Sequence, residues 1–103
     1  MAYSEKQRIF TVISGLEREI RDLGVETLSV FGSTVRDELR PDSDIDVLVR
    51  FRSGAKNYTR FLALLDLLER HLGRPIELVT TEALSPFIGP HILTEAQDVI
   101  RAA

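Results

Sequence analysis

Cysteine is absent from the 103 residues of this chain. Its absence excludes a disulfide framework and a zinc site built from thiolates, and it fits a reducing compartment. Long apolar runs are missing too, since no stretch approaches the roughly 20 residues that a membrane-spanning helix needs. Residues 1–6 also lack the apolar core of a signal peptide. We therefore expect a cytoplasmic protein that does not enter a membrane.

The chain has no excess of basic charge either. Thirteen Lys and Arg residues stand against sixteen Asp and Glu residues, which gives a formal net charge of −3. Because non-specific binding of DNA or RNA depends on cations that neutralise phosphates, a long nucleic acid is not the partner we expect. A small phosphorylated ligand stays open, because one local site can hold it whatever the net charge.

The apolar residues that are present predict helices and strands. A first helix begins near Ser4, which has capping-box spacing to Gln7, and its apolar face recurs every three or four residues until Gly24 ends it. Further along we expect a strand, a helical turn, a strand, a helix, a strand and a helix: residues 28–31, 34–39, 44–50, 58–71, 76–79 and 90–100. This order predicts one α/β domain over residues 1–103.

Two carboxylates stand close together on the second predicted strand. Because side chains alternate across a strand, Asp44 and Asp46 point to one face while Ile45 and Val47 pack inward. Neighbouring carboxylates repel each other, and a divalent cation turns that repulsion into a binding site. Magnesium prefers such oxygen ligands together with substrate phosphates. Taken alone, the Asp-x-Asp pattern is also compatible with two solvent-facing strand residues.

Gly32 and Ser33 end the preceding strand. A helical turn that starts there leaves N–H groups free for an anion, and the Ser33 hydroxyl adds a donor. Arg36 can reach a phosphate with its planar guanidinium. Taken alone, this segment is equally well an ordinary turn, with Arg36 in an ordinary surface ion pair.

Together, the Gly32-Ser33 segment and the Asp44–Asp46 segment place an anion site beside a metal site. A metal-chelated polyphosphate is the ligand that carries both a metal ion and anionic oxygens. Glu77 extends the pattern, because it is the only charged residue of the third predicted strand. If that strand lies beside the second, Glu77 completes a cluster of three carboxylates; otherwise it is an edge-strand charge. A basic group after Asp46 is interpreted as a solvated loop, with contact to a phosphate or an acceptor left open: Arg50, Arg52, Lys56 and Arg60.

Residues 31–36 and 41–49 resemble the minimal nucleotidyltransferases of the DNA polymerase beta superfamily. The motif of that family is Gly-Ser, a spacer of about ten residues, here residues 34–43, and then Asp-hydrophobic-Asp. Residues 72–80 look like the family's third-strand segment, and the similarity covers nearly the whole chain. The resemblance implies an α/β, DNA polymerase beta-like nucleotidyltransferase fold, a small mixed sheet with helices packed on it.

The resemblance also implies an activity: magnesium-dependent transfer of a nucleoside monophosphate, with AMP from ATP the expected case and another nucleoside triphosphate left open. It assigns two magnesium ions and the catalytic centre to three carboxylates. The site residues that it implies are Gly32, Ser33 and Arg36 for the β- and γ-phosphates, and Asp44, Asp46 and Glu77 for the metals and catalysis.

Two positions depart from the family pattern. The third carboxylate of these relatives is commonly Asp, whereas Glu77 is one methylene longer. That moves the carboxylate by about 1 Å, a displacement that can lower a rate by about 100-fold. Asp37 stands where glycine is frequent. Metal and nucleotide binding are therefore better supported by the residues than turnover is.

Minimal relatives of this kind are often paired with a HEPN-domain protein in toxin–antitoxin arrangements, with the nucleotidyltransferase as the antitoxin. The resemblance implies such a partner and two ways to neutralise it, by attaching AMP to a tyrosine or by direct binding. We expect an enzyme that modifies a partner protein, with a catalytically weak nucleotide-binding antitoxin as the alternative. Whether the chain forms homo- or hetero-oligomers is left open.

Overall fold

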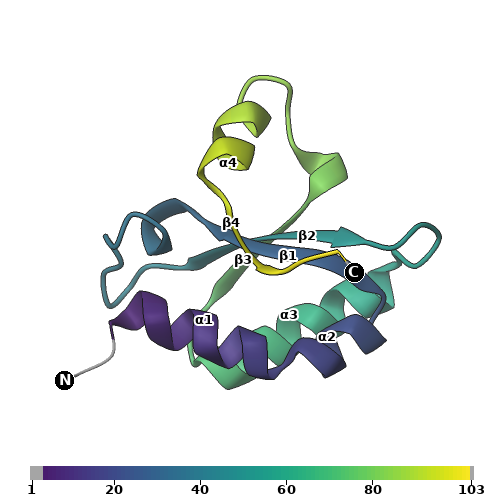
Figure 1. The fold of residues 1–103 in the computed structure, drawn as a ribbon, viewed down its shortest axis with the longest axis horizontal. Helices are drawn as coiled ribbons and strands as arrows, with labels where there is room; N and C mark the ends of the chain where they lie inside the picture. Colours follow the sequence, from purple (N-terminus) through teal and green to yellow (C-terminus); the bar gives the residue numbers. More distant parts are fainter. Residues whose placement is uncertain (1–3, 103) are drawn as a thin grey trace.

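In the computed structural model, which describes residues 4–102, four strands form one mixed sheet in the order β3-β2-β1-β4 (Figure 1). The central strand β1 pairs antiparallel with both β2 and β4, whereas β2 and β3 are parallel. The strand bounds are Val25–Phe31 for β1, Ile45–Phe51 for β2, Ile76–Thr80 for β3 and Gln97–Ile100 for β4. The predicted α/β class, helices on a small mixed sheet, is confirmed.

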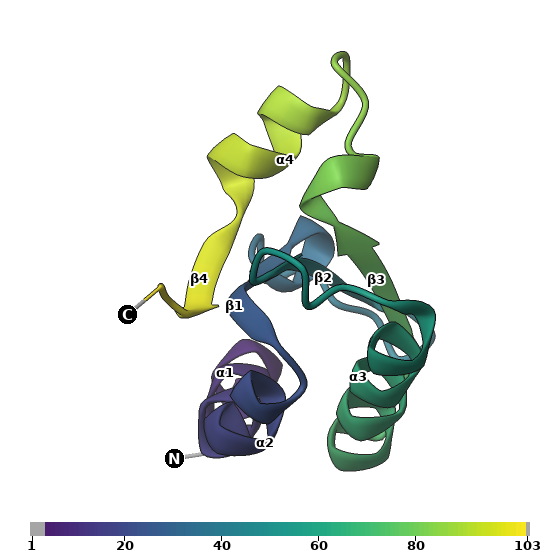
Figure 2. The ribbon, with the colours of Figure 1, turned by 90° about the vertical axis from the view of Figure 1, so that its right-hand side faces the viewer.

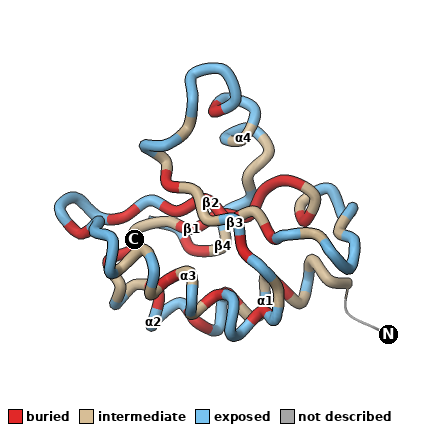
Figure 3. The backbone as a smooth tube through the Cα atoms, turned by 180° about the vertical axis from the view of Figure 1, so that it is seen from behind, coloured by how far each residue is buried: buried red, intermediate tan, exposed pale blue. Residues whose placement is uncertain are grey.

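Three helices cover one face of this sheet (Figure 2). They are α1 (Glu5–Gly15), α2 (Glu17–Asp22) and α3 (Tyr58–Leu72). Their apolar residues form the core together with alternate residues of the strands, and Figure 3 shows the buried positions along the strands and on the inward sides of α1 and α3. The fully buried members include Ile9, Ile13, Leu28, Val30, Ile45, Val47, Val49, Leu64 and Leu68.

The N-terminal helix begins as predicted but does not continue as predicted. The Ser4 hydroxyl accepts from the Gln7 backbone N–H at 3.1 Å, and the Gln7 side chain accepts from the Ser4 N–H at 3.1 Å, so the capping box is formed. The expected single helix to Leu23 is wrong, because the chain leaves α1 at Leu16 and starts α2 at Glu17. Gly15 precedes the break, and glycine costs about 1 kcal/mol in a helix interior.

The C-terminal segment corrects a second prediction. The expected helix over residues 90–100 ends at Glu95, where α4 (Gly89–Glu95) gives way to β4. Leu93 on α4 is 58% exposed, whereas Ile100 is buried as a residue of β4. The edge of β1 presents unpaired backbone groups that a further strand can satisfy, and β-branched Val99 and Ile100 suit a strand.

The face of the sheet opposite α1–α3 carries Asp46 and Glu77 besides the apolar Phe31 and Leu48. The short turn η2 (Thr81–Ala83) and α4 rise from this side as an arm, most of which is exposed (Figures 2 and 3). We call this side the open face. Within residues 4–102 no helix is both long and apolar enough to cross a membrane.

Candidate active site

Asp46 and Glu77 are neighbours on the open face. β3 lies beside β2, and the parallel register places Glu77 opposite Asp46. On its other side Asp46 is paired with Phe31, the last residue of β1. Asp46 is partly buried, whereas Glu77 is exposed. The condition for Glu77 to join the carboxylate pattern, a third strand adjacent to the second, is therefore met.

The position of Asp44 differs from the prediction. β2 starts at Ile45, so Asp44 lies just before the strand instead of on it and is exposed. Within the described range of residues 4–102, no three acidic, histidine or cysteine side chains stand close enough together to share a metal ion. As they lie here, Asp46 and Glu77 form a neighbouring pair of carboxylates, and Asp44 acts on Asp46 by its charge.

The electrostatics of Asp46 reflect this crowding of acids. The pKa of Asp46 is raised to about 6, mainly by burial and also by the charge and hydrogen bonding of Glu77 and the charge of Asp44, while Arg36 opposes the rise. Ionisation of Asp46 beside Glu77 is therefore less favourable than that of an ordinary aspartate, although a carboxyl with this pKa is still mostly ionised at pH 7. Carboxylate oxygens are chemically suitable ligands for magnesium, because the divalent cation prefers oxygen ligands and neutralises the repulsion between the two acids.

Gly32 is required by the carboxylate site for two reasons. It has a φ of +72°, which L side chains rarely adopt, and a Cβ built there would lie 2.1 Å from Asp46 Oδ2. A side chain at Gly32 would therefore displace the carboxylate of Asp46.

The Gly-Ser turn (residues 32–36) is shorter than predicted. Instead of a helical turn over residues 34–39, a 3₁₀ turn η1 (Gly32–Thr34) follows β1 directly. Asp37 closes the segment with a φ of 60°, a left-handed conformation that explains why glycine is frequent there. Thr34, which sequence reasoning passed over, is buried, and its hydroxyl has no hydrogen-bond partner among the described residues.

Glu95 is a second residue that sequence reasoning missed. The exposed Arg36 pairs with Glu38 at 2.8 Å and also with Glu95 Oε1. The backbone N–H of Gly32 donates to Glu95 Oε2 at 3.3 Å. The interpretation of Arg36 as a surface ion pair is therefore correct for this structure. Nothing in the local sequence signals the contact, because 59 residues separate Arg36 from Glu95.

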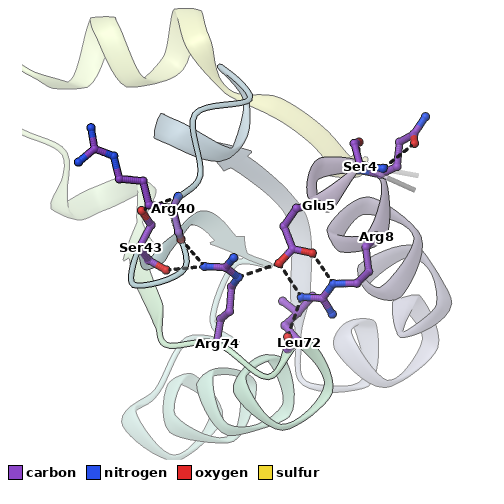
Figure 4. A network of polar contacts seen from close by, with 8 residues as sticks. Ser4, Glu5, Arg8, Arg40, Ser43, Leu72 and Arg74 are labelled. Carbon is purple, nitrogen blue, oxygen red and sulfur yellow. Dashed lines mark hydrogen bonds and ion pairs between the residues drawn. The ribbon is translucent and has the colours of Figure 1, made fainter. Parts of the chain in front are cut away.

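A polar network behind the site fixes the segment that carries Asp44 (Figure 4). The Arg74 guanidinium donates to the carbonyls of Arg40 at 2.9 Å and Ser43 at 3.1 Å, and its Nε donates to Glu5 at 2.8 Å. Ile45 N–H donates to the Pro75 carbonyl at 3.0 Å. Hydrogen bonds therefore hold the chain immediately before and after Asp44.

Glu5 is the acidic centre of the same network. Hydrogen bonding from Arg8, with a smaller contribution from Arg74 and against an opposing effect of burial, lowers the pKa of Glu5 to about 2. Arg8 also donates to the Leu72 carbonyl at the end of α3. The network thus ties α1 and α3 to the loop in front of β2.

The basic group after Asp46 has partners within the chain. Arg50 pairs with Glu26 at 2.6 Å, and Lys56 lies 3.4 Å from Glu82. Arg52 and Arg60 donate to backbone carbonyls, at 3.3 Å and 2.7 Å. The interpretation as a solvated loop holds for Arg52 and Lys56 only, because Arg50 lies within β2 and Arg60 within α3.

Known proteins share this arrangement of motif and fold. The family model described as nucleotidyltransferase domain matches residues 13–99. The protein adenylyltransferase MntA of Thermococcus cleftensis is 34% identical over 96 residues, which make up 92% of this chain and 96% of the relative.

Two solved structures have a similar fold. A crystal structure of a toxin–antitoxin with AMP-PNP matches with a TM-score of 0.72 and 20% identity, covering 90% of this chain and 73% of that one. A complex of a tri-AMPylated HEPN toxin with its MNT antitoxin, from Shewanella oneidensis, matches with a TM-score of 0.64 and 17% identity, with the same two coverages. At these identities the likeness concerns the fold alone.

Proposed function

This chain belongs to the nucleotidyltransferase domain family, and from this premise we propose that it transfers AMP from ATP to a partner protein. In the reaction a hydroxyl oxygen of the acceptor forms a bond to the α-phosphorus of ATP. The bond between the α-phosphorus and the oxygen that bridges it to the β-phosphate breaks, and pyrophosphate leaves. The observation that carries the proposal is the juxtaposition of Asp46, Glu77 and Gly32 at adjoining ends of three chain segments.

We assign the metal ligands to Asp44, Asp46 and Glu77. Bound magnesium, two ions in the proposed complex, would neutralise charge that develops on the attacking and leaving oxygens. Asp46 contributes a partly buried carboxylate whose place is kept open by Gly32. Glu77, at the exposed end of the pair, is assigned to the acceptor side, where it ligates metal or accepts the proton of the hydroxyl.

The phosphate-binding residues in this proposal are Gly32, Ser33 and Arg36. The Gly32 N–H and the Arg36 guanidinium already bind an anionic group in the structure, the carboxylate of Glu95. Ser33 lies between them in the η1 turn and is partly buried. These donors recognise charge and oxygen atoms, so they bind the triphosphate rather than the base.

The partner we propose is a HEPN-domain protein. In this proposal residues 1–103 act as one minimal domain, and this chain is the antitoxin of that partner. The support is the family relationship to a protein adenylyltransferase and the likeness of fold to an MNT antitoxin in complex with an AMPylated HEPN toxin. In this proposal the protein acceptor brings its own hydroxyl to the open face.

Incubation of the full chain with α-³²P-labelled ATP, magnesium and a HEPN protein tests the proposal. We expect label on the HEPN protein with wild type, and loss of label with Asp46→Asn or Asp44→Asn. Asp42→Asn is the matched control, because Asp42 is an exposed acid two residues from Asp44 and has no assigned role. Equal labelling by all four proteins would refute the site assignment.

One observation favours a second candidate, an antitoxin that binds nucleotide but acts by contact alone. The third carboxylate is the longer and exposed Glu77. Glu77→Asp separates the two candidates: faster transfer than wild type would identify a weakened enzyme, and slower transfer would mean that the longer side chain is matched to its site. Glu77→Gln should lower the transfer rate strongly and change nucleotide affinity little if the enzymatic assignment is correct.

A further inference from the structure

The C-terminal residue of α4 reaches across to the Gly-Ser turn. Glu95 accepts a hydrogen bond from the Gly32 N–H at 3.3 Å with one carboxylate oxygen and pairs with the Arg36 guanidinium through the other. Its side chain is 26% exposed, so the contact is partly screened from solvent. Both carboxylate oxygens are therefore engaged by the same turn.

These two donors are also the donors that the proposed function assigns to the triphosphate. A carboxylate and a phosphate offer the same features to them, a negative charge and paired oxygen acceptors. While the Gly32 N–H and the Arg36 guanidinium bind the Glu95 carboxylate, their hydrogen bonds are not available to a phosphate. Glu95 and a triphosphate consequently compete for one set of donors.

We propose that Glu95 is an internal competitor of the nucleotide, a carboxylate of α4 that occupies the phosphate-binding donors until a triphosphate displaces it. The proposal rests on the proposed function, because it uses the same donors. Its consequence is that nucleotide occupancy is linked to α4. Only Ala96 separates Glu95 from β4, and α4 belongs to the exposed arm, so displacement of Glu95 loosens the arm where it joins the sheet.

An alternative role for Glu95 predicts the opposite effect. If Glu95 orients Arg36 for the phosphates, its removal weakens nucleotide binding; if it competes, its removal strengthens binding. Glu38 provides the matched control, because it pairs with the same guanidinium at 2.8 Å but has no hydrogen bond to Gly32. A change that follows merely from freeing Arg36 would appear in both variants.

The test is a calorimetric titration of the full chain with magnesium and a non-hydrolysable ATP analogue, and separately with inorganic triphosphate. We expect Glu95→Gln to bind both ligands about tenfold more tightly than wild type, which corresponds to about 1.4 kcal/mol. Glu38→Gln should change either affinity by less than about twofold, well within the spread expected of an exposed ion pair. Circular dichroism of each variant verifies that it is folded.

Hydrogen exchange adds a readout that does not depend on affinity. In wild type the ATP analogue should speed amide exchange in α4, and in Glu95→Gln exchange there should be fast with and without ligand. This inference would be overturned if Glu95→Gln bound the ligands as wild type does or more weakly. The proposed function would still stand in that case, provided that wild type binds and Asp46→Asn does not. Failure of every protein to bind either ligand would overturn both.

Discussion

The two faces of the sheet are built from alternate residues of the same strands, yet their contacts have opposite effects on stability. On the face covered by α1–α3, Val47 and its neighbours are fully buried among apolar side chains, and each contact favours folding. On the open face, Asp46 stands beside Glu77 with its pKa raised to about 6. The comparison separates residues that stabilise the fold from residues that the fold holds in an unfavourable arrangement.

The largest effect is expected from damage to the covered face. Leu68 is fully buried against this face, so Leu68→Ala should lower the free energy of unfolding by about 3 kcal/mol through lost burial and a residual cavity. Leu62 on the same helix is 41% exposed and is the control, with an expected loss below about 1 kcal/mol for Leu62→Ala. Urea denaturation measures both, and equal losses would contradict the assignment of the core.

Gly32→Ala should affect both stability and binding. The left-handed backbone conformation should cost about 1–2 kcal/mol, and the new Cβ should push away the carboxylate of Asp46, which it would otherwise meet at 2.1 Å. We therefore expect weaker Mn²⁺ binding, measured by electron paramagnetic resonance, besides a lower free energy of unfolding. Gly54, also at positive φ but with nothing near an added Cβ, is the control: Gly54→Ala should be destabilised with its metal affinity unchanged.

Glu5 tests the network that supports the site from behind. Its folded-state pKa is about 2, below the ordinary 4.5, so it stabilises the fold above pH 4.5 and the contribution disappears as pH falls towards 2. Because its side chain is 32% exposed, we expect Glu5→Gln to cost only about 1 kcal/mol at pH 7. Urea titrations from pH 7 to 2 should show the difference from wild type vanish at the acid end, while exposed Glu19→Gln shows little difference throughout. A difference that is constant with pH would refute the ionic explanation.

The smallest effect concerns Asp37, whose φ is 60°. Asp37→Gly should raise the free energy of unfolding by about 0.5 kcal/mol, because glycine adopts this conformation without steric cost. Asp37→Ala should lower it, since alanine has neither that freedom nor a polar side chain. Thermal unfolding of the two variants checks the sign, and the same sign for both would show that the backbone conformation is not the cause.

Local signals made much of the fold predictable. Ser4 and Gln7 mark the first helix, and the alternation around Val47 marks β2, because capping and burial patterns act over a few residues. The secondary structure of residues 96–100 was not predictable, because this segment becomes β4 only by pairing with β1, which is far away in the chain. Hydrophobic periodicity alone could not exclude a helix there.

The sequence proposes the candidate site as a set of residues, but it does not give their arrangement. The motif brought Asp46, Glu77 and Gly32 to attention, and β-sheet pairing does make the two acids neighbours. The clash that a Gly32 side chain would cause depends on coordinates and is invisible in the sequence. The contact of Glu95 with Gly32 spans 63 residues and leaves no local pattern.

The central claim is that the open face gives up stability in order to bind a metal–nucleotide complex, and one thermal-shift comparison tests it most directly. Without ligand, Asp46→Asn should melt at a higher temperature than wild type, because burial and repulsion by Glu77 disfavour the ionised Asp46. With Mn²⁺ and a non-hydrolysable ATP analogue at saturating concentration, wild type should gain several degrees and the variant almost none, reversing the order. An equal gain by both proteins, or no gain by wild type, would contradict the claim.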